Sequence, residues 1–187
     1  REHLGLSYAT QSLHYTVEVA RGALREAARA TLREAGQPVL AQVKALDAWD
    51  DGSVRHVKVS FLAALGPYAA RTFVLDDTGQ ASKADGALKI EKQADAVILS
   101  SPLVAVEIPA LSRAFTPADP QPAEFPPPVS RIRGRRGWLG QGSIFLDSGF
   151  RLKERTVTVA DDGPIVKRVM VTSAFVMAAK SNTFAGD

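Results

Sequence analysis

The feature that most constrains the fold is a period-two alternation of residues on both sides of Asp50-Asp51-Gly52. Every second position of the flanks is apolar: Ala41, Val43 and Ala45 before the turn, and Val57, Val59 and Phe61 after it. Such alternation is typical of half-buried β-strands. Glycine at the end of a three-residue hairpin loop accepts a left-handed backbone without steric strain. The sequence therefore predicts a β-hairpin with Gly52 in the left-handed region.

The hairpin also predicts a register. The expected opposing pairs are Trp49 with Ser53, Asp47 with Arg55, Ala45 with Val57, Val43 with Val59, and Ala41 with Phe61. Asp47 and Arg55 would form a cross-strand pair of opposite charge. Lys44 would face Lys58, which requires a solvated face. A slip of one residue would turn the apolar set of one strand outward, so this register is well specified.

Similar alternation elsewhere predicts an all-β protein. Thr156 to Val159 alternate, and residues 166–175 are rich in β-branched side chains. Further turns are expected at 160–165, where ADDGPI repeats the Asp-Asp-Gly motif, and at DDTG, 76–79. Short strands between Gly, Asp and Pro clusters are typical of a sandwich or barrel. We expect one domain over residues 1–187, built of short strands with at most one short helix.

Two segments depart from the strand pattern. Residues 22–36, GALREAARATLREAG, have the composition of a helix, and taken alone they favour one. Residues 116–128 contain six prolines, which remove backbone donors and fix φ. We interpret 116–130 as a stiff loop or insertion over a β-rich body. A proline-rich ligand for another domain is the alternative.

Composition excludes several classes of function. Cysteine is absent, so disulfides and thiolate chemistry are excluded. The net charge of +3 is too small an excess to predict a nucleic-acid partner. The most apolar stretch, 97–111, is interrupted by polar residues and prolines and is too short for a membrane span. Because the chain begins with Arg1, we expect a processed protein or a piece of a longer one. The compartment stays open, with an extracytoplasmic or secreted location favoured.

No catalytic, metal or cofactor site is expected. The three histidines are scattered, without the spacing of a zinc site. Asp50 and Asp51 are adjacent in a turn, so they do not easily flank a glycosidic bond. The closely spaced glycines of 137–143 are followed by no helix, which favours a loop over a phosphate cradle.

The strongest chemical signal is RIRGRRGWLG at 131–140. Guanidinium forks match carboxylates, sulfates and phosphates, and an indole can stack on a sugar or a base. We predict an acidic-glycan site here, with single-stranded nucleic acid as a poorer fit and a solvated loop that docks on a neighbouring domain or subunit as the plain alternative. The candidate carbohydrate-binding residues are Arg131, Arg133, Arg135, Arg136 and Trp138, together with Trp49 in the first hairpin turn.

RGAL at 21–24 and PVLAQVKALDAWDDGSVRHVKVSF at 38–61 resemble the N-terminal domain of bacterial exo-rhamnogalacturonan lyase-like proteins. The matching positions include Gly22 to Leu24, Pro38, Gln42 and Trp49, while His56 stands where the family has an aromatic residue. The resemblance implies a RIFT-type β-barrel and a strand over Arg29–Glu34 that turns through Ala35 and Gly36. It also implies a separate catalytic region, so no catalytic residue is transferred to this chain.

The first functional hypothesis is a non-catalytic β-barrel accessory domain of a larger polysaccharide lyase-like protein, in contact with a neighbouring domain or subunit. The alternative is a structural or adhesion module of an extracellular or phage-tail-like assembly. A complete small enzyme ranks last, because no nucleophile, base or metal set converges.

Overall fold

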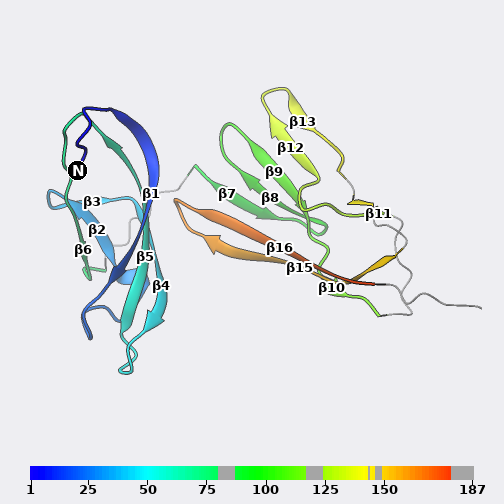
Figure 1. Cartoon of the computed structure of the whole chain (residues 1–187), viewed down its shortest axis with the longest axis horizontal. Coiled ribbons are helices and arrows are strands. Elements are labelled where there is room, and N and C mark those ends of the chain that lie inside the picture. Colours follow the sequence, from blue (N-terminus) through cyan, green and yellow to red (C-terminus); the bar gives the residue numbers. More distant parts are fainter. Residues whose placement is uncertain (80–86, 117–123, 143, 146–148, 178–187) are drawn as a thin grey trace, which may run out of the picture. The chain divides into compact units, whose positions relative to one another are not determined.

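The computed structural model describes residues 1–79, 87–116, 124–142, 144–145 and 149–177 (Figure 1). Almost all of its regular structure is β-strand, and the only helical element of these residues is one turn of 3-10 helix, η1 (Ala27–Arg29). The predicted all-β class with at most one short helix is confirmed. Within the same residues, no helix has the length and apolarity needed to cross a bilayer.

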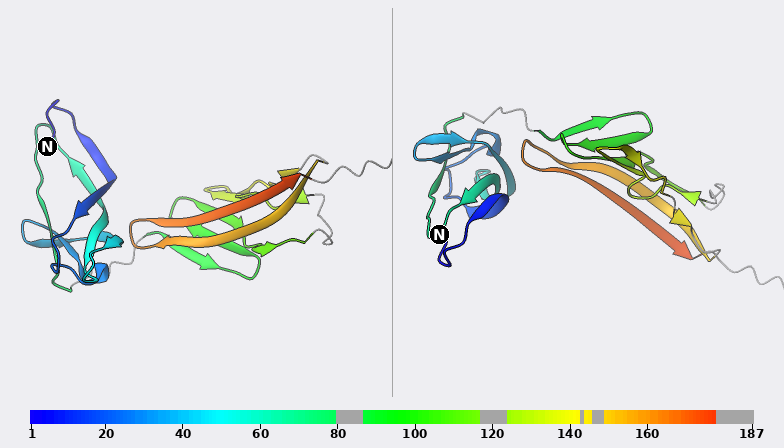
Figure 2. Two further views of the ribbon diagram at one scale, coloured as in Figure 1. Left: turned by 60° about the horizontal axis from the view of Figure 1, so that its bottom comes forward. Right: turned by 90° about the horizontal axis from the view of Figure 1, so that it is seen from above.

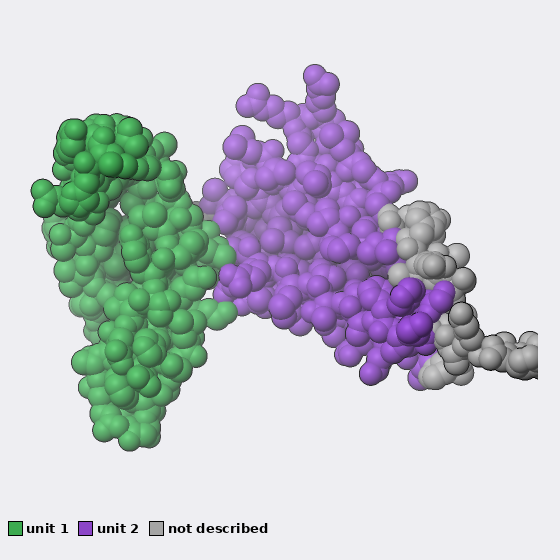
Figure 3. All heavy atoms as spheres, viewed as in Figure 1, with its two compact units in different colours: residues 1–86, 163–166 green, residues 87–162, 167–187 purple. Residues whose placement is uncertain are grey.

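The chain packs as two compact units, coloured separately in Figure 3. Unit 1 contains residues 1–86 together with 163–166, and unit 2 contains residues 87–162 and 167–187. The expectation of one domain over 1–187 stays a prediction, and each unit is described by itself.

Unit 1 consists of two three-stranded antiparallel sheets. The first has the order β1-β5-β4, with β1 (Tyr8–Glu18), β5 (Val54–Leu65) and β4 (Ala41–Ala48). The second has the order β3-β2-β6, with β3 (Gln37–Val39), β2 (Thr31–Glu34) and β6 (Phe73–Asp76). Their facing apolar residues form one core around Leu32, Val57, Val59 and Phe61, which are 0–5% exposed. Neither sheet closes on itself, and the RIFT-type identity stays a prediction.

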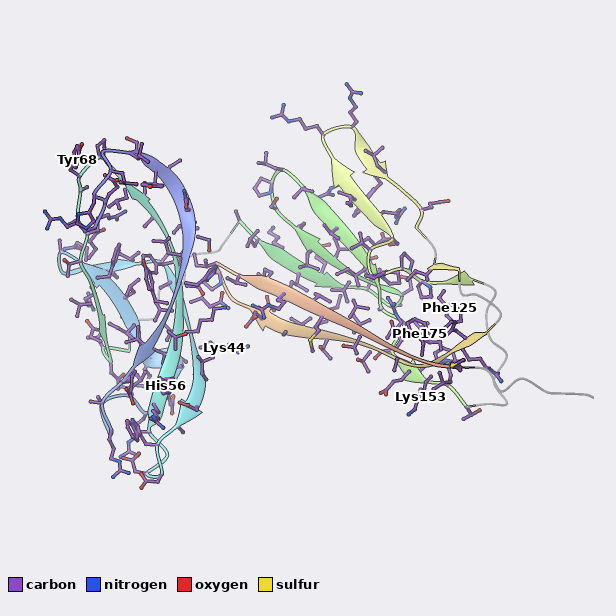
Figure 4. The ribbon with its side chains drawn as sticks, viewed as in Figure 1. Lys44, His56, Tyr68, Phe125, Lys153 and Phe175 are labelled. Carbon is purple, nitrogen blue, oxygen red and sulfur yellow. The ribbon has the colours of Figure 1, made fainter. Side chains whose placement is uncertain are left out.

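The predicted hairpin is confirmed in β4 and β5. Ala41 pairs with Phe61, Val43 with Val59, and Ala45 with Val57, as the alternation requires. The Trp49 amide donates to the Ser53 carbonyl at 2.7 Å, and Gly52 has φ +79°. Lys44 is opposite Lys58, as predicted, and its side chain is exposed to solvent (labelled in Figure 4).

The predicted pair of Asp47 with Arg55 is wrong. Two compensating bulges, at Leu46 and at Arg55, place Asp47 opposite His56. The Asp47 carboxylate accepts the His56 amide at 2.9 Å and also contacts the imidazole Nδ1. Arg55 instead pairs with Glu18 at 3.2 Å and lies over the ring of Trp49 at 4.7 Å. A carboxylate that caps both the backbone and the side chain of one residue makes this bulge favourable.

Residues 22–36 form less helix than their composition favours. Only η1 is helical, and β2 follows at once, turning through Ala35 (φ +48°) and Gly36 (φ +79°) into β3. The short helical turn is therefore confirmed, and the strand expected over Arg29–Glu34 is confirmed from Thr31 onward, whereas Arg29 belongs to the helical turn. Tertiary packing outweighs helix propensity in this segment, because Ala30 and Leu32 are buried in the core of unit 1, at 7% and 5% exposed.

Unit 2 contains a five-stranded antiparallel sheet and a long hairpin (Figure 2). The sheet has the order β13-β12-β9-β8-β7: β13 (Gly137–Leu139), β12 (Arg131–Gly134), β9 (Ala105–Pro109), β8 (Ala96–Ser100) and β7 (Lys89–Lys92). The hairpin pairs β15 (Phe150–Asp162) with β16 (Lys167–Met177), and β10 (Arg113–Ala114) joins its edge. The predicted turn at 160–165 is confirmed, since the Gly163 amide donates to the Val166 carbonyl at 3.1 Å.

Most of the proline-rich segment, residues 117–123, lies outside the described residues. The described remainder is ordered by pairing and by one arginine. A short strand, β11 (Glu124–Phe125), pairs with β14 (Ile144–Phe145), and Phe125 is 5% exposed (labelled in Figure 4). The buried guanidinium of Arg155 then donates to the carbonyls of Pro126 and Pro127 at 3.0 and 3.1 Å.

Candidate anion-binding hairpin

The arginine-rich sequence 131–140 forms a hairpin, where the sequence predicts a loop. Strands β12 and β13 pair through Ile132–Leu139, Arg133–Trp138 and Gly134–Gly137, which leaves Arg135 and Arg136 as a two-residue turn. Gly137 has φ +101°, a conformation that favours glycine, and this allows so tight a reversal. The hairpin is the edge of the five-stranded sheet, held to it by the pairing of β12 with β9.

Arg131 is the anchored end of this hairpin. Its guanidinium binds the Glu107 carboxylate with two nitrogens, with Nε 2.9 Å from Oε1. Ser130 donates to the same Oε1 at 2.9 Å. The hydrogen bond from Arg131 holds the pKa of the Glu107 carboxyl below its usual value, against the opposing effect of burial. The charge of Arg131 is therefore neutralised by Glu107 within unit 2.

Trp138 lies between the anchored and the exposed arginines. Its ring is half-buried, with the Arg131 guanidinium carbon 5.1 Å and the Arg133 guanidinium carbon 5.5 Å from its centroid. Both distances are within the range of a cation–π interaction. The indole thus restricts Arg133 to one region of the surface.

The free positive charge of the hairpin belongs to Arg133, Arg135 and Arg136. All three are exposed, and no carboxylate of the described residues pairs with them. Figure 4 shows long side chains ending in nitrogen that project from the tip of this hairpin, away from its ribbon. Three neighbouring guanidinium groups without a counter-charge repel one another, so an external polyanion would lower the energy of this tip.

Trp49 belongs to unit 1 and has a structural environment. Its indole Nε1 donates to the Val19 carbonyl at 3.0 Å. Arg55 and Arg21 lie over its ring at 4.7 and 5.7 Å, and Arg21 also pairs with Asp50. Of the six candidate residues, five therefore share one hairpin of unit 2, and Trp49 stabilises a different turn.

Unit 1 contains a feature that we did not predict from the sequence, a cavity of about 740 Å³ between its two sheets. Aromatic and aliphatic side chains of β1, β5, β2 and β6 make most of its lining. The signal was present in residues 13–17, where Leu13, Tyr15 and Val17 alternate with His14 and Thr16. That alternation indicates a strand, but it cannot show that the apolar face stays partly uncovered.

The described residues contain no cluster of side chains that is typical of a metal site or a nucleophilic triad. No group of three His, Asp or Glu side chains in them could hold a metal ion. His14 Nδ1 lies 2.8 Å from the Ser60 hydroxyl, but its Nε2 faces another hydroxyl, that of Ser12, at 3.2 Å. A base that is oriented by a hydroxyl lacks the carboxylate of a nucleophilic triad, and Ser60 is only 3% exposed.

Neither the models of known protein families nor the sequences of curated proteins match this chain.

Proposed function

We propose that this chain is a non-catalytic β-module that binds acidic polysaccharide through the tip of the β12–β13 hairpin. The observation that supports the proposal is the group of three exposed guanidinium groups at Arg133, Arg135 and Arg136, which lie on one hairpin and have no paired carboxylate among the described residues. Guanidinium forks recognise carboxylates in two-point contacts. A linear uronate polymer presents such groups repeatedly along one chain, so several contacts can form at once.

The hairpin divides its residues between support and contact. Arg131 pairs with Glu107 and holds the hairpin, and Trp138 orients Arg133. Arg133, Arg135 and Arg136 would contact the ligand. Preorganised groups lose less conformational entropy on binding, which favours affinity from few contacts. The resemblance of residues 21–61 to lyase-like proteins supports a carbohydrate-active parent, in which this chain would be an accessory domain.

The experiment is affinity electrophoresis in polygalacturonate gels at low salt. We expect retardation of the wild-type chain and loss of about tenfold or more in affinity on replacing Arg133, Arg135 and Arg136 with Gln, because each exposed ionic contact contributes up to about 1 kcal/mol. Binding should weaken as salt is added. The matched control replaces three exposed lysines of unit 2, Lys89, Lys92 and Lys153, with Gln, which removes the same net charge.

Three outcomes would overturn the proposal: no retardation at low salt, equal loss in both triple variants, or equal retardation in a neutral galactan gel. Tighter binding of single-stranded DNA than of polygalacturonate would assign the hairpin to nucleic acid instead. The accessory role is tested separately by the reading frame that encodes the chain, where we expect a continuation into a helical catalytic region.

A further inference from the structure

The cavity of unit 1 is a pocket between the two sheets that opens to solvent, and it measures about 740 Å³. That volume is within the range of pockets that bind small molecules. Since Tyr15 and Val17 of its wall are 55% and 40% exposed, apolar surface of β1 is left open to solvent.

One wall of the cavity is a continuous row of aromatic rings. Tyr15 stacks on Phe61 with 6.1 Å between ring centroids and 25° between ring planes. Phe61 in turn packs on Phe73 at 4.6 Å. Leu32 and Leu75 of the second sheet also line the space. Aromatic and aliphatic walls of this kind favour a ligand with a flat apolar body.

Three polar residues of the lining, Arg1, Glu2 and His3, belong to an N-terminal arm, residues 1–5. The Glu2 amide donates to the Ala69 carbonyl at 2.9 Å, and the Glu2 carboxylate accepts the amides of Leu4, Gly5 and Tyr68. Gly5 lies so close to the Tyr68 ring that a Cβ on it would be 2.6 Å from the hydroxyl (Tyr68 is labelled in Figure 4). These contacts fix Arg1 and His3 beside the cavity, where both belong to its lining.

The charged residues around the cavity differ in whether they already have a partner. The acid of the lining, Glu2, is occupied, because its carboxylate accepts three backbone amides. The lining cation Arg71 is also paired, because its guanidinium binds both oxygens of Glu34, at 2.6 and 2.5 Å. Arg1 and His3 have no partner of their own among the described residues. The lining therefore offers one unpaired cation and one imidazole, but no free carboxylate.

We propose that this cavity binds a small molecule that combines a flat apolar body with one acidic group. The body would pack against Tyr15, Phe61 and Phe73, and the acidic group would face Arg1 and His3. This site is independent of the hairpin of unit 2, because every residue that lines it belongs to unit 1.

The test uses two fluorescent probes, anilinonaphthalene sulfonate and its uncharged parent, phenylnaphthylamine, with the full chain. We expect saturable binding of both, with the sulfonate tighter by about two- to fivefold, the range of an exposed ionic contact. Replacing Arg1 and His3 together with Gln should remove that preference and leave the affinity for the uncharged probe unchanged. Tyr15→Ala should weaken both probes by roughly tenfold, and Tyr15→Phe should restore them.

Val74→Ala is the matched control, because Val74 is 57% exposed on β6 and does not line the cavity. Amide shifts on titration should be confined to the cavity-lining strands β1, β2, β5 and β6, their flanking loops and the N-terminal arm. The proposal is overturned by non-saturable binding, by equal effects of Val74→Ala and Tyr15→Ala, or by shifts spread over unit 2. It is also overturned if sedimentation shows a dimer that Tyr15→Ala dissociates, since a second copy would then fill the cavity.

Discussion

Replacing Gly52 with Ala tests the turn on which the architecture of unit 1 depends. Gly52 has φ +79°, and a Cβ built on it meets no atom within 4 Å. The substitution therefore introduces backbone strain without a steric clash. A left-handed conformation costs an L-residue about 1–2 kcal/mol, while Ala lowers the entropy of the unfolded chain and returns about 0.4–1 kcal/mol. The net loss in free energy of unfolding should be about 1 kcal/mol.

A second glycine isolates the strain. Gly66 in the same unit does not have a left-handed φ, and a Cβ there meets only the Ala69 side chain at an ordinary 4.0 Å. Gly66→Ala should produce the unfolded-state gain alone. Because that gain is common to both variants, the difference between them should equal the left-handed penalty, about 1–2 kcal/mol. Gly52→Asn should be nearly as stable as the wild type, since Asn tolerates this conformation.

The assay is urea unfolding followed by the fluorescence of Trp49, which adjoins the turn. Trp138→Phe serves as the background, so that unit 1 has the single reporter. If Gly52→Ala and Gly66→Ala unfold at the same urea concentration, Gly52 is not held in a left-handed turn and the reasoning fails.

Two further predictions concern unit 2, with Trp138 as the reporter. Arg155→Met should lower the free energy of unfolding by about 1–3 kcal/mol, because the buried carbonyl of Pro127 loses its donor; Lys153→Met, an exposed neighbour on the same strand, should be neutral, and a stabilised Arg155→Met would contradict this account. Because Arg131 depresses the pKa of Glu107 below 4.5, their pair stabilises the fold above that pH and loses this effect as pH falls through the lower folded-state pKa. The stability gap between wild type and Glu107→Gln should accordingly narrow in acid unfolding between about pH 6 and about pH 3, and a constant gap would argue against the pair.

Local alternation was sufficient to predict the hairpin of β4 and β5. The apolar pairs from Ala41–Phe61 to Ala45–Val57 agree with the period of two, because a slip of one residue would place the apolar residues of one strand on the polar face of the other. The bulges at Leu46 and Arg55 could not be predicted in this way. They depend on the Asp47 carboxylate capping the His56 amide, an interaction that no alternation rule contains.

The candidate site was predicted as a set of residues but not as a structure. Gly137, which the sequence suggests to be a loop residue, has the left-handed backbone that permits a tight hairpin. The pairing of Arg131 with Glu107 joins residues 24 positions apart. Sequence therefore indicates positive charge over 131–136, whereas the structure separates one neutralised arginine from three free ones.

The burial of Arg155 is a feature that the sequence did not predict. In RLKERTVTVA it is one more charged residue of an exposed-looking strand, yet it is 1% exposed and its Nε has no hydrogen-bond partner among the described residues. Burial lowers the pKa of its guanidinium. A buried cation without a carboxylate is unfavourable by itself. The hydrogen bonds that Arg155 donates to the Pro126 and Pro127 carbonyls offset this cost. Proline-rich backbone has carbonyls but few amides, and these carbonyls need a donor from elsewhere once Phe125 and Pro127 are buried. A forked, always charged side chain can reach two successive carbonyls at once, and this explains why an arginine, and not an apolar residue, fills a core position of β15.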